Sequence, residues 1–256
     1  MSARADMGTA RAATPKPTAI GGLAPVVLVM GKGGVGKTSV AAGLATLASD
    51  ARGKAVFVEF GDGESGKRAL SQAHRGVEHM VIRPDEALQR GAAPLFGSAA
   101  VATLALGNFA MKPLVRVAPA GRALAMLESV RQIAADRPGV RVVVDMPATG
   151  HGVAWLRVPR QGKHFIGAGP LHDFCERLAA ELVAPGFASI VVVTLPERLV
   201  LEETLELCNS VAAETGLEVD RIVVNRLPMA LPRAALDDAR ALVSREREGM
   251  RLHASA

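Results

Sequence analysis

The stretch Gly31-Lys32-Gly33-Gly34-Val35-Gly36-Lys37-Thr38 decides the fold class of this chain. It satisfies the pattern G-x-x-x-x-G-K-[ST], a glycine-rich loop whose backbone N–H groups bind phosphate. The preceding residues 25–30 form a short apolar run rich in β-branched side chains, which predicts a buried parallel strand. In residues 39–49 small and apolar side chains recur at helical spacing. The loop therefore joins a strand to a helix, as a phosphate-binding P-loop requires.

The residue types of the loop fit the chemistry of phosphate binding. Gly33, Gly34 and Gly36 can adopt backbone angles that other residues avoid, so the loop can wrap an anion. The N-terminus of the following helix adds its positive end. Lys37 is expected to reach the β- and γ-phosphates of a nucleotide, and the Thr38 hydroxyl is expected to hold Mg²⁺.

Composition restricts the other functions that the chain can have. Its 256 residues are 49% hydrophobic, enough for one large α/β domain, and no apolar run is long enough to predict a transmembrane segment. One Trp and no Tyr make base stacking on single-stranded nucleic acid unexpected, and the net charge of +5 permits an acidic surface as partner without requiring one. Cys175 and Cys208 form no C-x-x-C motif, so a reduced, cytoplasmic location is expected.

Strand-like and helical segments alternate along the chain. Further strands are expected at 54–60, 140–145, 188–194 and 220–225, with helices that include 171–182 and 199–215. This alternation predicts an α/β fold with a doubly wound, mostly parallel sheet. Residues 1–22 read as a disordered leader, and 23–256 as a single P-loop ATPase domain with a helical insertion at about 77–135. Polar side chains at strand ends, Asp62, Asp145 and Asn225, are expected to meet the P-loop at one nucleotide site.

The motif K-G-G-V-G-K-T at 32–38 resembles the deviant Walker A motif of a group of dimeric ATPases that includes MinD, ParA and the nitrogenase iron protein. The segment Asp145-Met-Pro-Ala-Thr-Gly-His151 is similar to the D-x-A-P-T-G-H switch II of one branch, the ArsA/Get-type or anion-transporting ATPase-like family. Weaker similarities to that family lie at 82–88, 118–124, 194–197 and 223–226, so the resemblance covers about 24–230.

The resemblance implies a role for each matching residue. Lys32 would contact the nucleotide of a partner subunit and stabilise charge on the transferring phosphoryl group in trans. Asp145 would position Mg²⁺ through water, and Asn225 would bind the adenine edge. The expected catalytic residues are thus Lys32, Lys37 and Asp62, the metal residues are Thr38 and Asp145, and the nucleotide-binding residues are Gly31, Lys32, Gly33, Gly34, Val35, Gly36, Lys37, Thr38, Ser39 and Asn225. ATP and Mg²⁺ are the implied ligands.

The chain departs from the family pattern at three places. Its switch I reads Gly61-Asp62-Gly63-Glu64, where the family has a T-D-P-A-H-like loop, so Asp62 is the first and Glu64 the second candidate for orienting water. The metalloid-binding cysteines and the zinc C-x-x-C motif of some members are absent. A predicted helix at 233–249 follows the Asn225 strand instead of another strand. Nucleotide is therefore expected to bind loosely, or a partner subunit to complete the assembly.

Three functions are consistent with these residues. The first is an ATP-driven, ArsA-type switch that acts as a homodimer, or as a heterodimer with a related ATPase subunit, on an unknown protein client. The second is a regulatory subunit that binds nucleotide with little hydrolysis, which the altered switch I favours. The third is a MinD- or ParA-like positioning ATPase, whose support is the basic residues near the two ends; no nucleic-acid partner is expected.

Overall fold

Six short apolar segments form the sheet. The computed structural model describes residues 21–71, 76–95 and 119–227. The strands are β1 (Val26–Gly31), β2 (Ala55–Phe60), β3 (Val77–Ile82), β4 (Arg141–Asp145), β5 (Ala188–Thr194) and β6 (Val219–Val224). Every residue of β1 and β5 is buried, because helices cover the sheet on both faces.

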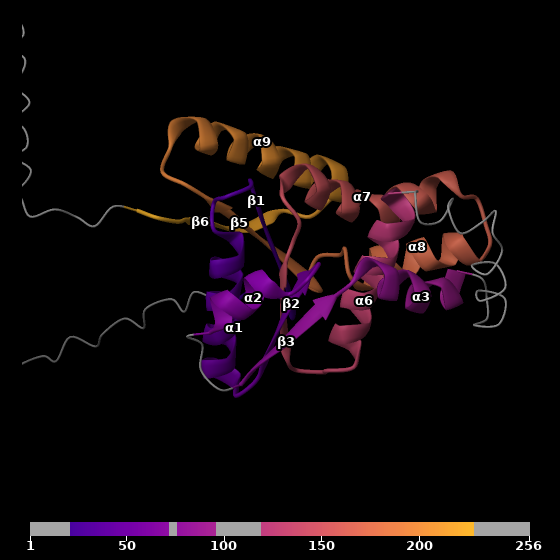
Figure 1. Cartoon of the computed structure of the whole chain (residues 1–256). Coiled ribbons are helices and arrows are strands. Elements are labelled where there is room, and N and C mark those ends of the chain that lie inside the picture. The colour runs from indigo at the N-terminus through magenta and orange to yellow at the C-terminus, as the bar shows by residue number, and fades with distance from the viewer. Residues whose placement is uncertain (1–20, 72–75, 96–118, 228–256) are drawn as a thin grey trace, which may run out of the picture. The chain divides into compact units, whose positions relative to one another are not determined.

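The strand order places the P-loop at the middle of the sheet. All strands are parallel, in the order β3-β2-β4-β1-β5-β6, and Figure 1 shows β1 entering this sheet next to β5. The chain moves outward from β1 in both directions, and ligands of such sheets bind at the carboxyl ends of the strands near this reversal. The predicted α/β class with a doubly wound parallel sheet is confirmed.

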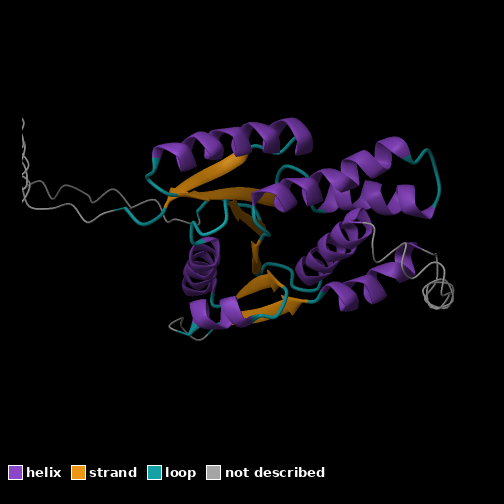
Figure 2. Ribbon diagram, turned by 45° about the horizontal axis from the view of Figure 1, so that its top comes forward, coloured by secondary structure: helices purple, strands orange, loops and turns teal. Residues whose placement is uncertain are grey.

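Helices form a layer on each face of the sheet (Figure 2). One face packs against α1 (Lys37–Arg52) and α2 (Glu64–Leu70), mainly through alanine, valine and leucine side chains. The other face packs against a larger group of helices: α3 (Pro84–Leu95), α6 (Pro119–Ala135), α7 (Thr149–Phe165), α8 (Pro170–Glu181) and α9 (Arg198–Thr215). The predicted helices at 171–182 and 199–215 correspond to α8 and α9.

The helical pattern expected for 77–135 is wrong for its first six residues. Residues 77–82 form strand β3, which pairs with β2 along its whole length. The polar residues Glu78 and His79 interrupt the apolar pattern by which a strand is predicted from sequence. They are tolerated because β3 lies at the edge of the sheet, where Glu78 binds Arg137 and His79 binds Glu59. The segments 84–95 and 119–135 are helical as expected, and 96–118 lie outside the described residues.

The structure does not test the predictions made for the two ends of the chain. The leader falls almost entirely outside the described residues, and so does the helix expected at 233–249. By its internal contacts the chain divides into one unit that ends at Asn225 and a second that begins at Arg226, and the whole candidate site belongs to the first. Within the described ranges, no helix is both long enough and apolar enough to cross a membrane.

Candidate nucleotide-binding site

The P-loop links the central strand to the longest helix on its face of the sheet. Strand β1 ends at Gly31 and helix α1 begins at Lys37. Gly36 precedes the helix with φ of 91°, and a Cβ there would collide with the Asn225 side chain, so this position requires glycine. The first turn of α1 holds no acidic residue. Its N–H groups therefore keep their positive field for an anion.

The other loop residues differ in exposure, and several of them line a cleft. Val35 is buried and anchors the loop in the core, whereas Gly33 and Gly34 are exposed. The walls of a cleft of about 440 Å³ include residues of the loop and of the start of α1: Gly34, Gly36, Lys37, Thr38 and Ser39. An anion in this cleft would meet the loop's backbone N–H groups.

Lys37 folds back over the loop that precedes it. Its ammonium donates a hydrogen bond of 3.0 Å to the backbone carbonyl of Lys32. Partial burial lowers the pKa of Lys37, and the attraction of Asp145 opposes this shift. A partly desolvated ammonium above the loop gains strongly from an anion, so the position of Lys37 suits phosphate.

Thr38 and Asp145 join the P-loop to the end of β4. The Thr38 hydroxyl donates a hydrogen bond of 2.6 Å to Oδ2 of Asp145. The second carboxylate oxygen, Oδ1, is buried and lacks a hydrogen-bond partner in the described part of the chain. Burial raises the pKa of Asp145, while the Thr38 hydrogen bond and the Lys37 charge lower it. An orphaned buried carboxylate oxygen marks a place where a further ligand belongs.

These oxygens fit Mg²⁺. The ion prefers hard oxygen ligands, keeps several waters and commonly uses one or two protein groups together with substrate phosphates. Thr38 Oγ1 could bind it directly, and the unpaired Asp145 Oδ1 could hold one of its waters. Among the residues described, no group of three or more His, Cys, Asp or Glu side chains forms a separate metal centre.

The expected switch I carboxylates lie on a surface turn. Oδ1 of Asp62 accepts a hydrogen bond of 3.0 Å from the Glu64 backbone, and Glu64 forms an ion pair of 2.8 Å with Lys67. Within the described residues, neither carboxylate is hydrogen-bonded to the P-loop. Helix α2 begins at Glu64, so the last residue of the expected switch I belongs to a helix.

Two further predicted residues, Lys32 and Asn225, link the P-loop to other elements. The Lys32 ammonium forms an ion pair with Glu203 on α9. The Asn225 side chain donates a hydrogen bond of 2.8 Å to the Val35 carbonyl, so it touches the loop itself. Its backbone N–H donates to the Thr194 carbonyl at the end of β5. The structure thus brings Lys32 and Asn225 to the site, and their roles toward a nucleotide stay predictions.

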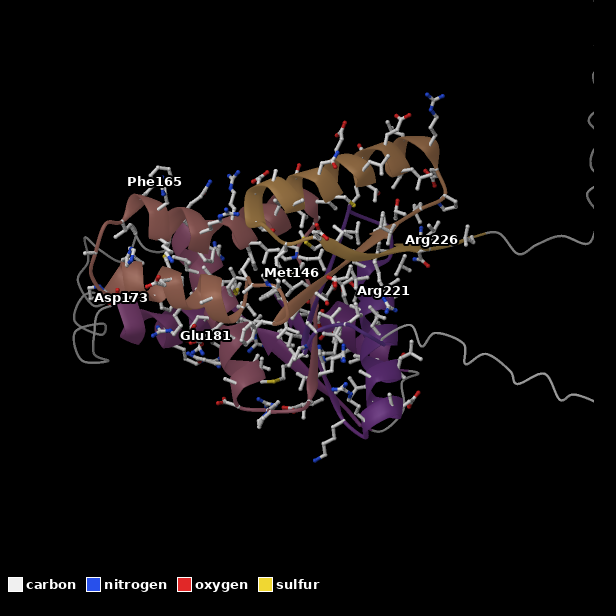
Figure 3. The ribbon with its side chains drawn as sticks, turned by 180° about the vertical axis from the view of Figure 1, so that it is seen from behind. Met146, Phe165, Asp173, Glu181, Arg221 and Arg226 are labelled. Atoms are coloured by element: carbon white, nitrogen blue, oxygen red, sulfur yellow. The ribbon has the colours of Figure 1, made fainter. Side chains whose placement is uncertain are left out.

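Sequence reasoning missed a buried carboxylate beside Asp145. Glu59 is 4% exposed, and in the register of β2 and β4 it stands directly opposite Asp145. It binds the backbone of α2 and the His79 ring. The signal was available, since Glu59 is a lone charge within the apolar strand sequence A-V-F-V-E-F. Met146 follows directly after the end of β4; Figure 3 labels it among the packed side chains, and it is 2% exposed.

The parallel sheet and the glycine-rich loop between its central strand and α1 define an α/β protein of the P-loop NTPase fold. No protein-family model matches the chain. It is 29% identical over 221 residues to ATPase BagA of Mycobacterium tuberculosis, across 78% of this chain and 64% of the relative. The same values hold for ATPase Mb3704 of Mycobacterium bovis. The chain spans less than two thirds of the length of these curated relatives.

Proposed function

We propose that this chain binds ATP with Mg²⁺ and hydrolyses it, acting as a nucleotide-driven dimeric switch of the ArsA type. The observation that carries the proposal is the hydrogen bond between Thr38 and Asp145, which leaves Asp145 Oδ1 buried and without a hydrogen-bond partner among the residues that the structure describes. A carboxylate that only caps the end of a strand would have hydrogen-bond partners for both oxygens. A carboxylate that binds a hydrated cation would leave one oxygen without a partner in the protein. The similarity to proteins named ATPase supports the same activity.

The reaction needs charge neutralisation more than covalent chemistry. Water attacks the γ-phosphorus, the bond from that phosphorus to the bridging oxygen breaks, and ADP and inorganic phosphate leave. Lys37 and the N–H groups at the start of α1 would hold the phosphate chain and stabilise its charge. When bound, Mg²⁺ would supply further positive charge at the β- and γ-phosphates.

The dimeric part of the proposal rests on Lys32. Its ammonium is half exposed and points to α9 of its own chain, so it does not fold over the loop as Lys37 does. A surface cation at the rim of the phosphate site can reach a nucleotide in a neighbouring subunit. This supports a role in trans, whether the neighbour is a second copy or a related subunit.

The decisive test compares nucleotide binding and phosphate release in the wild type and in Lys37→Ala, with Lys163→Ala as control. Lys163 pairs with Glu176 and provides an exposed lysine from another helix. We expect Lys37→Ala to lose at least 100-fold in turnover, because it removes a charge from the transition state. Equal turnover in Lys37→Ala and wild type, or absence of nucleotide binding to the wild type, would refute the proposal.

One observation favours a second candidate, a nucleotide-binding regulatory subunit with little hydrolysis. Asp62, the expected water-orienting residue, already accepts a hydrogen bond at the start of α2. A carboxylate with this structural role is not held over the phosphates. Tight ATP binding without phosphate release would select this candidate.

A further inference from the structure

Helix α2 presents a short stripe of side chains to the P-loop. Ser65, Arg68 and Ala69 are spaced i, i+3 and i+4, so they share one side of the helix. The same three residues line the 440 Å³ cleft together with the loop and the start of α1. Helix α2 therefore supplies one wall of the cleft in which an anion would bind.

The position of α2 is set by the sheet. Both carboxylate oxygens of the buried Glu59 accept hydrogen bonds from the Gly66 N–H, at 3.1 and 3.0 Å. Oε1 of Glu59 also lies 2.7 Å from Nε2 of His79 on β3. Gly66 packs so closely on these groups that a Cβ would lie 2.6 Å from the Phe57 ring and would collide with Glu59. The stripe on α2 is thus held at a fixed place beside the cleft.

Arg68 brings an available positive charge to this wall. Its Nε donates a hydrogen bond of 3.3 Å to the Glu64 carbonyl in the previous turn of the helix. In the part of the chain that the structure describes, no carboxylate forms an ion pair with its guanidinium. Its neighbour Lys67, which does not line the cleft, pairs with the Glu64 side chain at 2.8 Å. Of the two neighbouring cations on α2, Arg68 lines the cleft and Lys67 does not, and Arg68 is the one that lacks a carboxylate partner among the described residues.

We propose that Arg68 is a second phosphate-binding cation, whose guanidinium donates hydrogen bonds to the phosphate chain of the nucleotide that the P-loop holds. Glu59 is the positioning residue that holds α2, and with it Arg68, at the cleft. A guanidinium suits this task because its planar fork of donors matches phosphate oxygens. The proposal rests on the proposed function, since it assigns a further contact to the same nucleotide.

The test measures dissociation constants for Mg·ATP, Mg·ADP and adenosine by calorimetry. In Arg68→Ala we expect affinity for ATP and ADP to fall about tenfold or more, the usual scale for a charge-assisted hydrogen bond, with adenosine binding unchanged. Arg68→Lys should recover part of the loss, because it restores the charge but not the fork. Lys67→Ala is the matched control and should bind as the wild type does.

A double variant separates the positioning role of Glu59 from a general structural role. Glu59→Gln should weaken ATP binding in the wild-type background and cause little further loss in Arg68→Ala, since the two residues act through one contact. Equal losses in both backgrounds would remove the positioning role. Wild-type affinity in Arg68→Ala, together with loss of binding in Lys37→Ala, would overturn the inference while the proposed function stands. No binding to the wild type would overturn both.

Discussion

The Lys32 ammonium donates a hydrogen bond of 2.6 Å to the Glu203 carboxylate, which ties the second lysine of the P-loop to helix α9 of the same chain. Both side chains are partly exposed, at 44% and 38%, so the ion pair is screened by solvent and easily exchanged. They lie at a cleft of about 400 Å³ between α7 and α9. A lysine that acts on the nucleotide of another subunit must first leave Glu203.

Glu203→Gln should therefore favour the ATP-dependent dimer. The substitution keeps the size of the side chain but removes the charge that holds Lys32, so we expect a several-fold lower dimer dissociation constant in Mg·ATP. Light scattering in Mg·ATP and in Mg·ADP measures this. Glu206→Gln is the control, because Glu206 lines the same cleft and forms no ion pair within the described residues. A Glu203→Gln protein that dimerises no better than the wild type in ATP would disprove the competition.

Lys32→Ala and Lys37→Ala should affect different steps. We expect Lys32→Ala to lose at least tenfold in turnover while its affinity for nucleotide changes less than threefold, because Lys32 is proposed to act across the dimer. Lys37→Ala should lose both binding and turnover. Single-turnover kinetics with parallel binding curves distinguish the two cases. Full turnover in Lys32→Ala would contradict the role in trans.

Asp145→Asn should make the nucleotide-free chain more stable at neutral pH. Burial raises the pKa of Asp145 above its unfolded value. Such a group contributes stability below the unfolded pKa of about 3.9, and this contribution is lost as pH rises through the folded pKa. At pH 7.5 the buried, ionised carboxylate therefore lowers the stability of the folded chain. Removing it should raise the melting temperature by roughly 2–4 °C, the shift for about 1 kcal/mol in a chain of this size.

Thermal melts at pH 7.5 and near pH 4.5 check this sign. The gain from Asp145→Asn should shrink at the lower pH, where the wild-type carboxyl is increasingly protonated. Asp50→Asn, which changes an exposed carboxylate on α1, is the control and should show no such difference. An equal gain at both pH values would mean that burial of charge is not its cause.

Asp62→Asn tests whether switch I supports hydrolysis. Asparagine keeps an oxygen that can accept from the Glu64 backbone, so the turn and the melting temperature should be preserved. If Asp62 orients the attacking water, we expect phosphate release to fall at least tenfold with ATP affinity unchanged. Turnover that is already low in the wild type and unchanged in both Asp62→Asn and Glu64→Gln would favour the regulatory subunit.

The strands that were predicted are those with continuous apolar runs, such as β1 and β5, where burial on both faces requires such residues. Strand β3 was not predicted from the sequence, because Glu78 and His79 interrupt its apolar pattern. Its position at the edge of the sheet allows these polar residues. Helix α2 was not predicted, because Gly66 within it lowers helix propensity, and tertiary contacts of Gly66 override this local preference. Local sequence cannot report such contacts.

The same distinction holds for the site. The P-loop is visible in the sequence because its chemistry depends on eight consecutive residues. Asp145 could be predicted as a site residue because it ends an apolar strand and begins the segment that resembles switch II. The pairing of Lys32 with Glu203 joins residues 171 positions apart, and the approach of Arg68 to the cleft depends on Glu59. These relations follow from sheet order and helix placement, which no single motif encodes.

The close packing of Gly66 also has a consequence for mutational tolerance. This glycine lies outside every nucleotide-binding motif, yet any side chain there would meet Glu59, Phe57 and His79 at once. In a saturation-mutagenesis scan, position 66 should therefore tolerate substitution as poorly as Gly36, while the exposed Gly43 in the middle of α1, whose Cβ would meet no atom within 4 Å, should accept alanine freely. The positions that tolerate no substitution would thus include the P-loop and also the face of α2 that packs on β2.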